Sequence, residues 1–271
     1  MSGIVGGVGS KSGVIGKTEE VGEGVVNVDR PGFGPYTSDE YTTLLIHSDT
    51  TNGSTTFIDS SPTSAAITNS NASHKTDHAK IGKSSIYFDN GDFLTVPDSV
   101  GLSFGRKAFT IDYWMKHSGG ATNRRVIGQG GGVGTESAGQ WFIRERVHLD
   151  YGVYAPFDTT NVGVADTWHT TNLMDGYWHH ICLTKGDNEE GGTVLQMAID
   201  GTFPSGYYNV ASGGGKTVNE NTDWRNLEET VPGAVLHIGG CSFNSEKWQG
   251  WLDEIRISKG IQRWKSNFTV G

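Results

Sequence analysis

The chain has 271 residues, a formal net charge of −9 and 40 glycines. This length fits one large all-β domain with an additional arm, and glycine at about twice its usual share of roughly 7% favours short strands joined by tight turns. The acidic balance argues against nucleic-acid binding, and no apolar run approaches the roughly 18 residues of a membrane span.

Residues 1–41 form a Gly-rich N-terminal segment with too few large apolar side chains to build a core. We therefore predict an anchoring arm that gains order from a surface outside it, and residues 31–35 (PGFGP) are its turn-rich linker. The first seven residues lack the basic start and apolar stretch of a signal peptide, so we expect no export. The apolar side chains predicted to anchor the arm are Ile4, Val5, Val8, Val14 and Ile15.

Residues 42–271 contain short alternating patterns that are typical of strands. Every second residue from 109 to 115 is apolar, which predicts a strand with one buried face. Residues 195–199 alternate in the same way, and the Asp200-Gly201 pair that follows predicts a tight turn.

Residues 178–183 place large or apolar side chains on both faces, so we predict a strand that is covered on both sides. Adjacent strand residues point to opposite faces, and therefore His179 and His180 are predicted to have structural roles and not to share a metal. Cys182 and Cys241 are interpreted as buried thiols in preference to a disulfide, because a domain of this size does not depend on one.

Two long polar interruptions, residues 155–175 and residues 202–231, carry aromatic side chains. Loops of this length within a compact domain are usually functional. Aromatic rings in such loops can stack on sugars, but they are equally typical of protein interfaces, and both interpretations stay open. The candidates for a glycan site or an interface are Trp168, Tyr207, Tyr208 and Trp224.

Residues 250–260 (GWLDEIRISKG) are predicted to form a strand near the end of the chain. A period of two places Asp253 on the same face as Trp251, Ile255 and Ile257, within an apolar row. An ionised carboxylate in that position costs several kcal/mol unless it is compensated. We therefore expect a cation, backbone donors or water beside Asp253.

Together with residues 266–269 (SNFT), this strand resembles the closing strand of the laminin-G-like jelly rolls of the concanavalin-A-like lectin/glucanase group. The resemblance covers residues 42–271 and implies an antiparallel β-sandwich. Within it, two of the matching segments, 80–89 and 93–99, are expected to form a hairpin. The segments that agree in order are 44–54 (LLIHSDTTNGS), 80–89 (KIGKSSIYFD), 93–99 (FLTVPDS), 109–114 (FTIDYW) and 176–184 (GYWHHICLT).

The resemblance also implies a structural Ca²⁺ that ties the opening loop to the last strand. Asp253 and Asp49 are its implied ligands, with carbonyl oxygens of the Asn52-Gly53 turn completing the shell. Ser48 departs from the family pattern and makes Asp49 the weaker match. The alternative is that Asp253 accepts backbone amides and binds no ion.

Glucanases of this group carry paired carboxylates in a Glu-x-Asp pattern. The sequence contains no Glu-x-Asp, and we therefore predict a protein that is not an enzyme.

Residues 7–16 (GVGSKSGVIG) are similar to the N-terminal tails of phage virion proteins. This resemblance implies a virion surface protein made in the host cytoplasm, either a capsid decoration protein or a tail or head fibre component. Its expected partners are capsid or tail proteins of the same virion, further copies of itself, and host-surface glycans. A free carbohydrate-binding lectin is the alternative, and a divergent glycosidase is a third.

Overall fold

The computed structural model describes residues 35–89, 91–105, 107–119, 124–130, 141–145, 149–153, 164–165, 172–186, 195–203, 233–240 and 247–270. Regular structure in these residues consists of strands, and no helix among them has the length and apolar character to cross a membrane. The strands are β1 (Thr42–Ile46), β2 (Thr68–Ser70), β3 (Ser73–Lys75), β4 (Ser85–Phe88), β5 (Phe93–Val96), β6 (Phe109–His117), β7 (Arg124–Gln129), β8 (Trp141–Glu145), β9 (Leu149–Val153), β10 (Val164–Ala165), β11 (His179–Lys185), β12 (Leu195–Ile199), β13 (Leu236–Ile238) and β14 (Gly250–Lys259).

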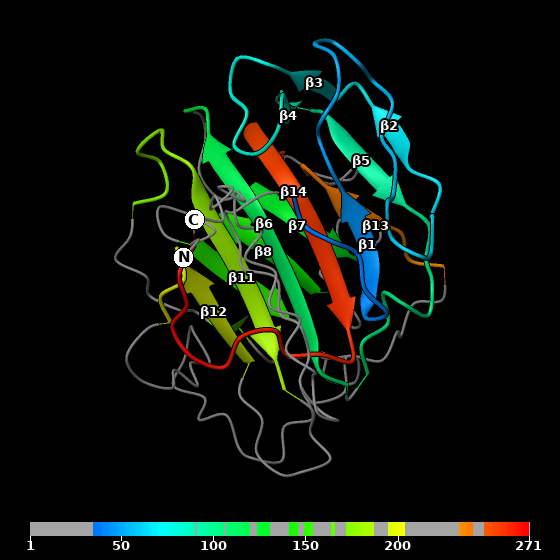
Figure 1. Cartoon of the computed structure of the whole chain (residues 1–271), viewed down its shortest axis with the longest axis vertical. Coiled ribbons are helices and arrows are strands. Elements are labelled where there is room, and N and C mark those ends of the chain that lie inside the picture. Colours follow the sequence, from blue (N-terminus) through cyan, green and yellow to red (C-terminus); the bar gives the residue numbers. More distant parts are fainter. Residues whose placement is uncertain are drawn as a thin grey trace, which may run out of the picture.

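The strands form two antiparallel sheets. The front sheet has the order β12-β11-β6-β14-β4-β3, and β1 pairs with the last part of β14. The back sheet has the order β10-β9-β8-β7-β13-β5-β2. In Figure 1, β12, β11, β6 and β14 lie in front of β8, β7 and β13. The all-β, antiparallel sandwich expected from the sequence is confirmed.

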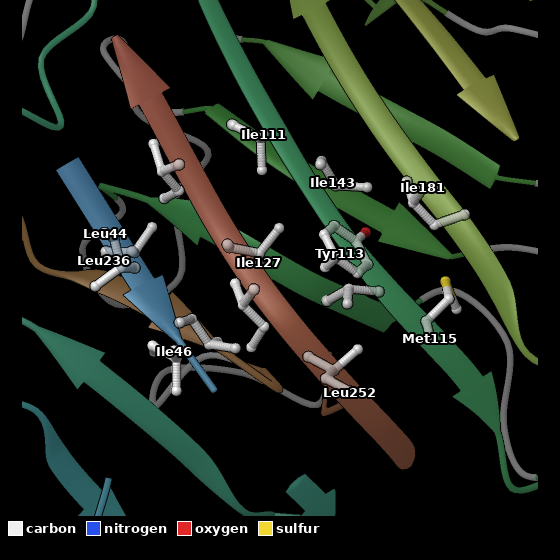
Figure 2. Close-up of a cluster of buried hydrophobic side chains, with 14 of the residues drawn as sticks. Leu44, Ile46, Ile111, Tyr113, Met115, Ile127, Ile143, Ile181, Leu236 and Leu252 are labelled. Atoms are coloured by element: carbon white, nitrogen blue, oxygen red, sulfur yellow. The ribbon is translucent and has the colours of Figure 1, made fainter. Parts of the chain in front are cut away.

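Apolar side chains from both sheets fill the space between them. The inward side chains of β6, at Ile111, Tyr113 and Met115, belong to one cluster with Ile127 of β7 and Ile143 of β8, and none of the five is more than 1% exposed (Figure 2). Burying an apolar side chain of this size stabilises a fold by roughly 1.5–3 kcal/mol. The alternation predicted for β6 therefore correctly identifies the face that meets the core.

The other face of β6 is also buried, so the prediction of one buried face was wrong. Thr110, Asp112 and Trp114 are at most 2% exposed. Tyr36 packs with Trp114, and the Thr110 hydroxyl donates a hydrogen bond to a carbonyl of the C-terminal segment, residues 260–270. Figure 1 shows this segment crossing the lower part of the front sheet. The two ends of the described chain thus cover the outer face of β6, which the alternating sequence of β6 predicts to face solvent.

β4 and β5 do not form the predicted hairpin. β4 pairs with β14 and β3 in the front sheet, whereas β5 pairs with β13 and β2 in the back sheet. The chain therefore crosses between the sheets after β4. Each strand takes its partners from distant parts of the sequence, which a local pattern does not specify.

A β-bulge interrupts the alternation of β14. The pairing of β14 with β6 shifts between Asp253 and Arg256, and Glu254 adopts a φ of 48°. Because of this extra residue, Leu252 and Ile255 both face the core, while Asp253 lies on the outer face. The predicted apolar row containing Asp253 was therefore wrong, although the carboxylate is buried as expected.

Two local predictions hold at β11 and β12. Every residue of β11 is buried, as expected for a strand covered on both sides. Asp200 and Gly201 have φ values of 51° and 75° and form the predicted tight turn, in which a Cβ at Gly201 would overlap the Phe268 carbonyl. Cys182 is a buried free thiol, and Cys241 lies outside the described residues.

Candidate functional site

The outer face of the front sheet, which points away from the core, carries a buried ion pair. Asp112 of β6 and Arg256 of β14 are both fully buried. Arg256 donates from Nε to Asp112 Oδ1 at 3.1 Å and from Nη2 to Oδ2 at 3.0 Å. This two-bond geometry is the strongest arrangement available to a guanidinium and a carboxylate.

Aromatic rings separate this pair from solvent. The Tyr36 ring lies 4.2 Å from the Arg256 guanidinium carbon, and its hydroxyl is 2.9 Å from His180 Nε2. Trp264 and Phe268 of the C-terminal segment pack edge-on against the His180 ring, with centroids 5.9 and 5.7 Å away. The cluster is closed on all these sides, so we assign it a structural role.

The charges in this cluster are set by burial and by Arg256. Burial alone would raise the pKa of Asp112, but the Arg256 guanidinium and His180 outweigh it and hold that pKa at about 2. Burial lowers the pKa of His180 and raises the pKa of Tyr36 well above its usual value. At neutral pH the cluster therefore contains one ion pair and two neutral rings.

Asp253 has the backbone donors that its burial requires. Its Oδ2 accepts hydrogen bonds from the amides of Lys80 and Ile81, each at 3.0 Å, and its Oδ1 accepts one from Glu254 at 3.0 Å. Burial, with a smaller contribution from the Glu254 charge, nevertheless raises the pKa of Asp253 to about 7. The side chain thus fixes the loop before β4 to the last strand.

Asp49 binds the same loop, where its Oδ1 accepts a hydrogen bond from the Lys83 amide at 3.0 Å. The structure therefore brings Asp49 and Asp253, the two carboxylates predicted to bind calcium, to one loop. Their partners are N–H donors, whereas calcium takes six to eight oxygen ligands. Within the described part of the chain, no group of three or more His, Cys, Asp or Glu side chains could hold a metal ion. Backbone amides are therefore partners of both carboxylates.

Calcium at Asp49 and Asp253 remains a prediction that melting can test. A Ca²⁺ ion bound only to the native state raises the melting temperature, so a chelator is expected to lower it and added calcium to restore it. The measurement is thermal unfolding of the full chain in EDTA and in millimolar CaCl₂. Identical melting temperatures in the two buffers would rule out the ion and leave the amides as the partners of these carboxylates.

A serine–histidine pair near β1 has hydrolase-like contacts but is closed to substrate. Ser48 Oγ is 2.6 Å from His74 Nδ1, and His74 Nε2 is 3.0 Å from the Thr56 carbonyl oxygen. Ser48 and His74 are at most 2% exposed, and the Phe57 ring stacks on the imidazole. This pair holds the loop after β1 in place.

The outer face is more open where β14 begins. Trp251 is paired in register with Tyr87 of β4 on one side and Lys116 of β6 on the other. The Trp251 ring centroid lies 5.0 Å from that of Tyr87 and 4.3 Å from that of His78. Trp251, Tyr87, Lys116 and His78 are half-buried. Trp178, which packs near Trp114, is half-buried as well. We call Tyr87, Trp251, Lys116 and Trp178 the aromatic row.

The sequence-predicted contact residues do not include the aromatic row. Its members occur in or beside the predicted strands. An aromatic side chain that points outward between two core-facing positions is the sequence signal that could have identified them. The predicted glycan or interface residues Trp168, Tyr207, Tyr208 and Trp224 lie outside the described residues. So do the predicted anchoring residues Ile4, Val5, Val8, Val14 and Ile15.

The architecture defines this chain as an antiparallel β-sandwich. No family model and no curated protein matches it. Among solved structures, it is similar to domain 4 of an extracellular GH43 arabinanase from Geobacillus stearothermophilus, solved in complex with arabinotriose. That match has 16% identity and a TM-score of 0.53, and it covers 81% of this chain and 92% of that chain.

Two toxin domains are similar as well. The binding domain of Paraclostridial mosquitocidal protein 1 matches 83% of this chain with 12% identity and a TM-score of 0.52. The binding domain of botulinum neurotoxin serotype D matches 82% with 14% identity and a TM-score of 0.51. This chain spans 50% and 49% of the lengths of those two chains. At such identities the likeness shows the fold alone.

Proposed function

We propose that this chain is a non-enzymatic, glycan-binding protein of the phage virion surface. The observation that carries the glycan part is the lectin-like sandwich, whose arabinanase neighbour was solved in complex with arabinotriose. The half-buried rings of the aromatic row add support, because ring faces exposed on a rigid sheet can stack on the C–H face of a sugar.

The non-enzymatic part of the proposal rests on the carboxylates and on the serine–histidine pair. The sequence lacks the Glu-x-Asp pattern of the glucanases that share this type of fold. Ser48 and His74, which could otherwise suggest acyl transfer, are buried under Phe57. Binding and display need no reactive group, and a stable sandwich suits both.

The virion part rests on the N-terminal arm. Residues 35–41, the last part of that arm, pack on the sandwich: Tyr36 lies over Arg256, and Arg263 donates to both Asp39 oxygens at 2.9 Å. We assign the binding of capsid or tail proteins to residues 1–34, and many copies would be displayed on one particle. A free lectin outside a virion is the competing function.

Removing residues 1–34 separates anchoring from binding. The truncated chain keeps Tyr36 and Asp39, so we expect an unchanged melting temperature and unchanged binding to a glycan array that includes arabinan. Incorporation into particles is expected to be lost, as measured by mass spectrometry of purified virions from infected cells. The full chain, expressed in the same way, is the control.

Each part of the proposal can fail separately. Particles that still contain the truncated chain would contradict the anchoring role of residues 1–34. Absence of the full chain from particles, with glycan binding intact, would favour the free lectin. A full chain that binds no glycan on the array would contradict the glycan-binding part.

A further inference from the structure

The aromatic row crosses the front sheet at the end where β14 begins. Trp251 is directly opposite Tyr87 and Lys116 in the strand pairing, so these three side chains point to the same face. Trp178 immediately precedes β11, the neighbour of β6 on the other side, and packs against the Trp114 cluster. The row thus carries three aromatic rings and a lysine: Tyr87, Trp251 and Lys116 lie on adjacent strands, and Trp178 lies just before the next strand, β11.

This part of the outer face differs from the rest of it. Around Arg256 the same face is sealed by Tyr36 and the C-terminal segment, and the groups there are buried. The aromatic row is half-buried instead. Trp251 is flanked by the rings of His78 and Tyr87, and its indole nitrogen has no hydrogen-bond partner among the described residues. Grouped aromatic side chains at a surface typically mark a binding site.

The charges around the row favour an anionic ligand. Lys116 makes no ion pair with any described residue, and the Lys80 ammonium lies 4.0 Å from the centroid of the neighbouring Trp114 ring. The carboxylates closest in sequence to Trp251 are occupied: Asp253 accepts three amides, and Glu254 is 2.9 Å from His47 Nδ1. Lys116 therefore gives the row a positive charge that is paired with no described carboxylate.

We propose that the aromatic row binds an acidic polysaccharide, with sugar rings stacked on Tyr87, Trp251 and Trp178 and a sugar carboxylate paired with Lys116. This inference rests on the proposed glycan-binding function and names its ligand class and its site. A purely apolar partner would bury the Lys116 ammonium without a counter-charge. A peptide cannot join the sheet here, because β14 and β6 are hydrogen-bonded on both sides.

The test uses the full chain and two groups of polysaccharides. The acidic group is polygalacturonate, alginate and hyaluronate, and the neutral group is amylose and arabinan. Binding is measured by isothermal titration and by the change in tryptophan fluorescence. At least one acidic polysaccharide is expected to bind. Lys116→Gln should weaken it about two- to fivefold, and Tyr87→Ala or Trp178→Ala should weaken it about tenfold or more.

Lys265→Gln is the matched control, because Lys265 is exposed on the C-terminal segment and outside the row. It is expected to leave binding unchanged, and melting temperatures show whether each variant is folded. Failure to bind any of the acidic polysaccharides overturns this inference, as does acidic-glycan binding that survives all three row substitutions. Binding of amylose or arabinan alone overturns it too, but leaves the proposed glycan-binding function standing.

Discussion

Replacing Arg256 with methionine is expected to lower the free energy of unfolding by about 3–5 kcal/mol. The substitution leaves Asp112 fully buried without the guanidinium that holds its pKa at about 2. An uncompensated buried carboxylate must then take up a proton or admit water. Urea denaturation at pH 7, with the m-value checked for two-state behaviour, measures the loss.

A second variant separates the effect of the unpaired charge on stability from the effect of lost side-chain packing. Arg256→Met combined with Asp112→Leu removes both charges, and it is expected to recover much of the loss, because apolar replacements of buried ion pairs are often neutral. Asp77→Asn is the control for a surface charge. Asp77 is exposed on the loop before β4, so its substitution is expected to change the free energy of unfolding by no more than about 0.5 kcal/mol. An Arg256→Met effect as small as that of Asp77→Asn would contradict the assigned role of the buried pair.

The free energy of unfolding is expected to fall as the pH rises from about 4 to 7, owing to Asp253. In the folded chain its pKa is about 7, against 3.8 for an ordinary aspartate, so the folded state keeps a proton that the unfolded state releases. The state that binds more protons is favoured at low pH, and the total contribution is about 4 kcal/mol. Asp253→Asn keeps an acceptor for the Lys80 and Ile81 amides and is expected to remove this decline.

The free energy of unfolding is measured against pH for the wild type and for Asp253→Asn. The difference between the two curves gives the contribution of the Asp253 carboxyl group. His47 and His179 have raised pKa values and lose their stabilising charge as the pH rises through those values, but they contribute to both profiles. Asp49→Asn, an exposed change in a side chain that bonds the same loop, is expected to leave the pH dependence as in the wild type. Parallel profiles for wild type and Asp253→Asn between pH 4 and 7 would show that Asp253 ionises normally in the folded chain.

Sequence alone was sufficient for features that depend on neighbouring residues. Alternation within β6 and β12 identified core-facing side chains, and Asp200-Gly201 identified a turn, because side-chain direction and backbone torsion are local properties. The need of Asp253 for partners was likewise predictable from the cost of burying a carboxylate. The sandwich architecture was implied by the resemblance of the ordered strand motifs to laminin-G-like jelly rolls.

Tertiary structure decided which surfaces and strands meet. The bulge at Glu254 moves Asp253 to the outer face, and β4 and β5 join different sheets, because pairing depends on partners far away in the chain. Tyr36 and the C-terminal segment bury the second face of β6 for the same reason. The aromatic row likewise exists only through pairing, since Tyr87, Lys116 and Trp251 are distant in sequence and adjacent only in the sheet. A linear pattern specifies which way a side chain points, whereas its neighbours are set by the packing of the whole chain.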